Sequence, residues 1–179
     1  MVRLFAAVAI PPLIAEGLVR RQTGLLGASW RPVEAFHITL RFFGDINEAV
    51  ADDVDSALAV VSGPALDLSL KGVGSFGDGD DIDAIWAGVE ANPALTQLAG
   101  RCESAARRAG LKADTRTYRP HVTLAYLRRP DPSSVAVWEQ ANNLLKSPPF
   151  RIDRFGLYSS HQTSEGSRYR LERAYRLGS

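Results

Sequence analysis

The sequence is poor in residues that support disulfide formation, metal binding or covalent catalysis. Cys102 is the single cysteine, which excludes an internal disulfide and a cysteine-based zinc cluster. No Gly-x-Ser-x-Gly elbow is present, and no Gly-Lys-Ser/Thr follows the glycine-rich segment 72–81. A nucleophile triad and a phosphate-binding P-loop are therefore unsupported.

Long apolar runs and a strong net charge are also missing. The apolar run that ends at Ile10 is cut by two prolines, and no run approaches the roughly 18 residues that span a membrane. The formal net charge is +1, which does not indicate a protein that coats nucleic acid. Arginine greatly outnumbers lysine and concentrates in 116–129 and 151–176, and its planar fork suits phosphate. We expect a monomeric cytoplasmic protein with no membrane partner.

Strand and helix patterns alternate along the chain, which favours a mixed fold. Apolar spacing and capping residues predict strands at about 2–10, 35–43, 66–70, 82–89, 120–127, 150–158 and 168–176, and helices at about 13–27, 47–61, 92–110 and 133–145. The glycine- and aspartate-rich segment 72–81 predicts an exposed hairpin loop. No linker marks a boundary, so we expect residues 1–179 to form a single domain.

Two short segments repeat the pattern His-x-Thr-x inside an apolar strand: FHITL at 36–40 and PHVTL at 120–124. Because side chains alternate along a strand, His37 and Thr39 share one face, as do His121 and Thr123. Two neighbouring imidazoles can supply a neutral base and a protonated acid, and hydroxyls can bind phosphate oxygens. The repeat therefore predicts acid–base chemistry at phosphorus. The two histidines lie 84 positions apart, close to half the chain, which suggests a duplicated unit.

A metal centre is the weaker interpretation of the same residues. Zinc would need a third histidine, cysteine or carboxylate at a recognisable spacing, and neither motif has an acidic residue between its histidine and threonine. The third histidine, His161, lies in a polar stretch that is typical of a loop. We expect no metal and no cofactor.

Both motifs and their flanks resemble the 2H phosphoesterase superfamily. Within it, the chain is similar to the bacterial and archaeal RNA 2′,3′-cyclic phosphodiesterases, historically called 2′-5′ RNA ligases. The resemblance runs in order along nearly the whole chain, through RLF at 3–5, WRP at 30–32, FHITLRFFG at 36–44, GVGSF at 72–76, IWAGV at 85–89, RPHVTLA at 119–125 and LYSS at 157–160.

The resemblance implies an α+β, bilobal, duplicated fold. Two antiparallel sheets, one from each half, would flank a central groove with helices outside. The implied activity is metal-independent hydrolysis of an RNA or nucleoside 2′,3′-cyclic phosphate to a 2′-phosphate and a 3′-hydroxyl. His37 would protonate the departing 3′ oxygen, His121 would activate water, and Thr39 and Thr123 would bind phosphate oxygens.

Four further residues are expected to contact substrate. The resemblance gives Phe42 a stacking role on the nucleobase, although simple alternation places Phe42 on the core face and Phe43 on the histidine face. Relatives often have a basic residue after the second motif, where this chain has Tyr126, so Arg41 or Arg119 would supply the positive charge.

Two alternatives stay open at this stage. The same fold would serve 2′-5′ RNA ligation or cleavage, or the opening of another small cyclic phosphate, with specificity set by 72–81 and 159–167. A non-catalytic module that binds RNA ends is the alternative from a different class, although binding alone has little need for two titratable groups.

Overall fold

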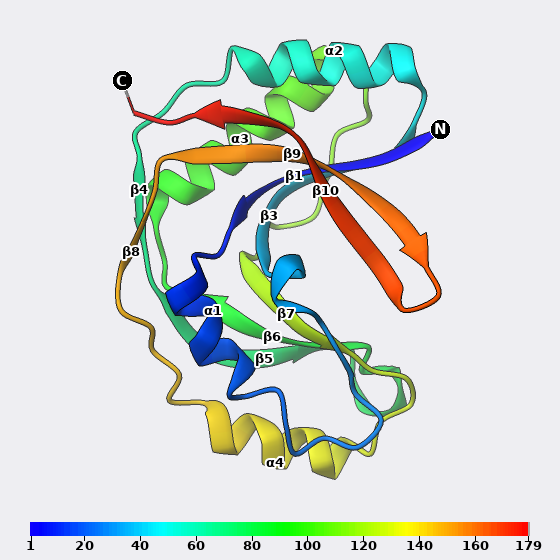
Figure 1. Cartoon of the computed structure of the whole chain (residues 1–179), viewed down its shortest axis with the longest axis vertical. Coiled ribbons are helices and arrows are strands. Elements are labelled where there is room, and N and C mark those ends of the chain that lie inside the picture. Colours follow the sequence, from blue (N-terminus) through cyan, green and yellow to red (C-terminus); the bar gives the residue numbers. More distant parts are fainter. Residues whose placement is uncertain (179) are drawn as a thin grey trace.

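Two four-stranded antiparallel sheets face each other in the computed structural model, which describes residues 1–178 (Figure 1). Sheet A has the order β10-β9-β1-β3 and contains β1 (Val2–Ala9), β3 (His37–Ile46), β9 (Arg154–Thr163) and β10 (Gly166–Arg176). Sheet B has the order β2-β7-β6-β5 and contains β2 (Ser29–Trp30), β5 (Leu70–Phe76), β6 (Ala84–Val89) and β7 (His121–Tyr126). Short strands β4 (Leu66–Leu68) and β8 (Phe150–Ile152) pair separately. The predicted α+β architecture of antiparallel sheets is confirmed.

Four α-helices cover the sheets: α1 (Pro12–Val19), α2 (Glu48–Ala59), α3 (Pro93–Arg108) and α4 (Pro132–Asn142). In Figure 1, α2 lies beyond sheet A and α4 lies beyond sheet B. Asparagine side chains cap two helices as the sequence predicts, because Asn47 accepts from the Val50 amide and Asn92 from the Leu95 amide. Single 3-10 turns occupy Val33–Ala35 and Gly79–Asp81.

The sheets do not correspond to the two halves of the chain, which corrects one expectation. Sheet A combines β1 and β3 from the first half with β9 and β10 from the C-terminus, and sheet B combines the short β2, which precedes β3, with β5, β6 and β7 from the middle of the chain. The C-terminal strands can join sheet A because β3 pairs with only one edge of β1. Strand β9 pairs with the other edge.

Three predicted element boundaries were wrong. Helix α1 ends at Val19 rather than near residue 27, because Gly24 and Gly27 adopt positive φ and form loop structure. The expected hairpin loop at 72–81 is strand as far as Phe76, because Val73 to Phe76 pair with β6 and Gly74 lies beneath a tryptophan side chain of that strand. The expected loop at 159–167 is mostly the hairpin of β9 and β10.

One hydrophobic cluster extends through both sheets. Its most buried members include Phe36, Ile38 and Leu124, which flank the two motifs, together with Phe155 and Leu98. The apolar residues that alternate with the histidines and threonines therefore hold the motif strands in place. None of the helices within residues 1–178 is both long enough and apolar enough to cross a membrane.

Candidate active site

A cavity of about 290 Å³ lies where the two sheets meet, and both sequence motifs line it. Strands β3 and β7 approach each other at this point. Sheet A contributes His37, Thr39 and Phe42, and sheet B contributes His121, Thr123 and Tyr126. No aspartate or glutamate is among the lining residues, although the chain contains 20 acidic residues. We call this space the central cavity, and its lining suits an anion.

His37 is the more deeply buried of the two motif histidines, with 9% of its surface exposed. The rings of Tyr158 and Tyr169 lie 4.4 and 5.8 Å from the imidazole, centroid to centroid. Burial lowers the pKa of His37 to about 4, and an interaction with the Ala35 backbone opposes this shift only in part. His37 is therefore neutral at pH 7.

His121 occupies the corresponding place in sheet B. Its Nδ1 donates a hydrogen bond to the carbonyl of Arg119 at 2.6 Å, which leaves Nε2 as the acceptor nitrogen of the neutral ring. Phe76 and Trp86 stand 4.8 and 6.0 Å from the imidazole centroid. Burial lowers the pKa of His121 as well, so both histidines disfavour the charged form.

A bulge in β3 decides which phenylalanine faces the central cavity. Arg41 pairs with Ala6 and Thr39 with Ala7 on β1, so Leu40 is an extra residue that shifts the alternation by one position. Phe42 consequently lines the cavity with 43% of its surface exposed, whereas Phe43 is buried. Simple alternation gave the opposite assignment.

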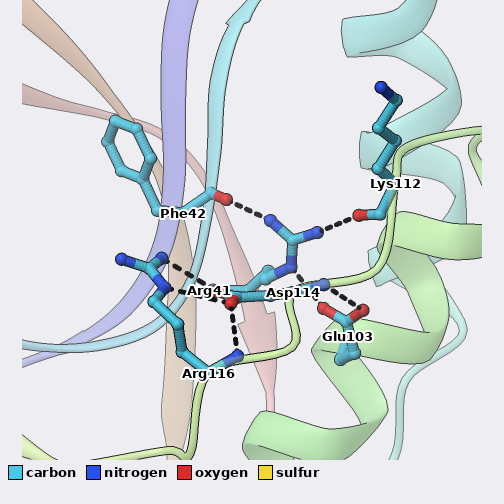
Figure 2. A network of polar contacts seen from close by, with 6 residues as sticks. All are labelled: Arg41, Phe42, Glu103, Lys112, Asp114 and Arg116. Carbon is cyan, nitrogen blue, oxygen red and sulfur yellow. Dashed lines mark hydrogen bonds and ion pairs between the residues drawn. The ribbon is translucent and has the colours of Figure 1, made fainter.

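Arg41 points away from the central cavity, which corrects its expected place beside the phosphate. The bulge turns its side chain toward α3, where the guanidinium pairs with Glu103 and donates to the carbonyls of Phe42 and Lys112 (Figure 2). The other carboxylate oxygen of Glu103 accepts from the Asp114 amide at 3.0 Å. Arg41 thus ties the first motif strand to the segment that leads into the second motif.

Arg31 is a buried, positively charged residue that the sequence did not single out. It lines the central cavity with only 7% of its surface exposed, and no carboxylate lies within 4 Å of it in residues 1–178. Its guanidinium donates to the Ser167 carbonyl at 3.0 Å and lies 5.5 and 5.4 Å from the ring centroids of Tyr126 and Tyr169. Buried arginines are usually paired with a carboxylate, so a guanidinium buried without one at a cavity wall is suited to bind an anion.

The other expected contact residues divide between two places. Tyr126 lines the central cavity, whereas the Arg119 side chain lies outside it, 5.2 Å from the ring centroid of Phe76. His161 does not reach the cavity: it is hydrogen-bonded to Ser159, which also donates to Glu172. Within residues 1–178 no three His, Cys, Asp or Glu side chains are grouped closely enough to hold a metal ion.

Arg3, Ser160 and Ser167 also line the central cavity and were not anticipated. Arg3 lies in β1, which pairs with the first motif strand β3, and that pairing is seen only in the structure. The two serines lie in the segment 159–167, which was expected to be a loop and instead forms the adjoining ends of β9 and β10.

Comparison with known proteins identifies the family. A family model described as the 2′-5′ RNA ligase superfamily matches residues 11–164. The RNA 2′,3′-cyclic phosphodiesterase of Escherichia coli K12 is 28% identical over 181 residues, covering 93% of this chain and 92% of the relative. The enzyme of the same name from Thermotoga maritima is 28% identical over 163 residues, covering 88% and 82%.

Solved structures show the same fold. The crystal structure of E. coli LigT complexed with 3′-AMP superposes with a TM-score of 0.79 at 24% identity, covering 99% of both chains. A crystal structure described as a phosphoesterase gives a TM-score of 0.80 at 22% identity. With a family match over most of its length and relatives aligned almost end to end, the chain belongs to the 2′-5′ RNA ligase superfamily.

Proposed function

We propose that the protein hydrolyses the 2′,3′-cyclic phosphate of an RNA end or nucleotide to a 2′-phosphate and a 3′-hydroxyl, without a metal. The observation that carries the proposal is that two His-Thr pairs from opposite sheets line one cavity without carboxylates. The names of the relatives support the same reaction.

The phosphate is held by neutral hydroxyls and one buried cation. Thr39 and Thr123 donate to its non-bridging oxygens from opposite sides of the cavity. Arg31 supplies the positive charge, because its guanidinium is already desolvated and oriented by the Ser167 carbonyl. Phe42 and Tyr126, each about half exposed, offer aromatic surface to the terminal nucleoside.

The two imidazoles perform the proton transfers on opposite sides of the phosphorus. His121 is the general base, because its Nδ1 hydrogen is held by Arg119 and its Nε2 is free to take a proton from water. Attack breaks the bond to the 3′ oxygen, and His37 gives that oxygen its proton. Because burial lowers the pKa of His37 to about 4, it acquires this proton when the bound phosphate anion raises its pKa.

The test is incubation with a 2′,3′-cyclic mononucleotide in EDTA, with the product identified by ³¹P NMR. We expect a 2′-phosphate as the only product, and we expect His37→Ala and His121→Ala each to lower kcat by about 10²–10⁴-fold, the usual contribution of one positioned acid or base. A 3′-phosphate product or loss of turnover in EDTA would refute the mechanism. RNA binding without any turnover would favour the binding-module alternative.

Ligation is the second candidate, favoured by the description of the matched family. If an RNA 5′-hydroxyl replaces water as the nucleophile, the same displacement of the 3′ oxygen leaves a 2′-5′ phosphodiester. Incubating a cyclic-phosphate RNA with an excess of a 5′-hydroxyl RNA tests this reaction, and a joined product that is cleaved at the same junction in dilute solution would establish it.

A further inference from the structure

A second and larger cavity begins at His121, outside the central cavity. It has a volume of about 770 Å³, and His121 lines both spaces. Its walls are the outer end of sheet B, the segment 118–121 and the first turns of α3. We call this space the α3 groove. Its volume lies in the range of about 300–1,000 Å³ that is typical of ligand sites.

The floor of the α3 groove is aromatic because a glycine makes room for an indole. Trp86 pairs with Thr123 on one side and with Gly74 on the other, so its side chain is on the same face of sheet B as the second motif. A Cβ atom at Gly74 would lie 2.4 Å from the indole, so only glycine fits at this position. The indole therefore lies against the backbone of the sheet, with Phe76 at 5.4 Å between centroids.

Besides His121, which can titrate, the groove is lined by two charged residues, and both are positively charged. They are Lys71 and Arg119, and the groove has no aspartate or glutamate in its lining. Neither cation has a carboxylate within 4 Å in the described part of the chain. The Arg119 guanidinium lies over the ring of Phe76, so a positive charge lies directly beside the aromatic floor.

We propose that the α3 groove binds the nucleotide on the 5′ side of the cyclic phosphate, with its base on Trp86 and Phe76 and its phosphodiester between Lys71 and Arg119. This inference rests on the proposed function. A cyclic phosphate occupies the 3′ end of an RNA, so the rest of the strand leaves the central cavity in the 5′ direction. Cations beside aromatic platforms are the combination that binds single-stranded nucleic acid, and the groove starts at a catalytic histidine.

The inference is tested by the ratio of kcat/KM for a trinucleotide ending in a 2′,3′-cyclic phosphate to kcat/KM for the cyclic mononucleotide. In the unaltered protein we expect the ratio to be well above one. Trp86→Leu should lower the ratio roughly tenfold, because one stacked base is lost. Lys71→Ala should lower it roughly threefold, and more strongly at low ionic strength.

Lys146→Ala is the matched control. This variant removes one positive charge close to Lys71, because Lys146 and Lys71 form a backbone β-bridge. The Lys146 side chain, however, pairs with Glu90 and does not line the groove. The control should leave the ratio unchanged. A ratio near one in the unaltered protein, or a ratio that neither groove variant alters, would overturn the inference while leaving the hydrolysis intact.

Failure of the proposed function gives a different pattern, because neither substrate would then be hydrolysed. In that case the same trinucleotide, labelled at its 5′ end, is used in a fluorescence anisotropy titration. Weaker binding by Trp86→Leu and Lys71→Ala, but not by Lys146→Ala, would still support the groove as an RNA site. Equal affinities for all four proteins would overturn it.

Discussion

Replacement of Arg31 by methionine should affect activity and stability in different ways. In activity, the variant loses the single buried cation of the central cavity, and removal of one preorganised donor usually costs about 10²–10³-fold in rate. We therefore expect kcat/KM for the cyclic mononucleotide to fall about 100-fold. Arg31→Lys keeps the positive charge but not the forked guanidinium, so its kcat/KM should lie between those of the unaltered protein and Arg31→Met.

In stability, the opposing contributions nearly cancel. Loss of the hydrogen bond to the Ser167 carbonyl and of two cation–π contacts costs about 3–5 kcal/mol in total. Removal of an unpaired buried charge returns a desolvation penalty of several kcal/mol. We therefore expect the free energy of unfolding to change by no more than about 1 kcal/mol, the difference between those two contributions.

The assays are steady-state kinetics and urea unfolding, each with and without inorganic phosphate. Phosphate should stabilise the unaltered protein by mass action and should stabilise Arg31→Met much less. Arg21→Met is the control, because Arg21 is half-buried and donates to Asn142 outside the central cavity. An Arg31→Met protein that loses several kcal/mol of stability yet keeps kcat/KM within threefold would show that Arg31 is structural.

Three further outcomes follow from the same structure. The pKa of His37 is about 4 in the folded state and about 6.5 in the unfolded state, so the unfolded state binds more protons between these two pH values. Acidification from pH 7 to pH 4 should therefore lower the free energy of unfolding by about 3 kcal/mol through this residue. In urea unfolding, His37→Gln should abolish that part of the loss. Arg41→Ala should lower the free energy of unfolding by about 2 kcal/mol and should also lower kcat. A double-mutant cycle with Glu103 should show strong coupling, and independent effects of the two substitutions would contradict the network in Figure 2. Gly74→Ala should cost about 1–3 kcal/mol of stability, because its Cβ would overlap the Trp86 indole, and unchanged stability would contradict that packing.

The sequence predicted what depends on local pattern. Strand alternation placed both His-Thr pairs correctly on a shared face, and the caps Asn47 and Asn92 marked where two helices begin. These features depend on residues a few positions apart, which periodicity and capping rules describe.

The features that it missed depend on contacts between distant strands. The bulge at Leu40 exists only in the pairing of β3 with β1, and it exchanged the faces of Phe42 and Phe43 and turned Arg41 to α3. Arg31 is an ordinary polar residue until β10 and the neighbouring tyrosines bury it. Glycines at 72–77 read as loop residues because nothing nearby indicates that an indole from β6 lies over one of them.

The pH dependence of kcat/KM for the cyclic mononucleotide tests most directly whether two imidazoles act together on one phosphate. This parameter reports the ionisations of the free enzyme, and burial lowers the pKa of both His37 and His121. The account predicts a bell-shaped profile with its optimum below about pH 6.5, the ordinary pKa of histidine, and a tenfold decline per pH unit on the alkaline side. A profile that keeps rising into the alkaline range, or that lacks one limb, would contradict the paired-histidine mechanism.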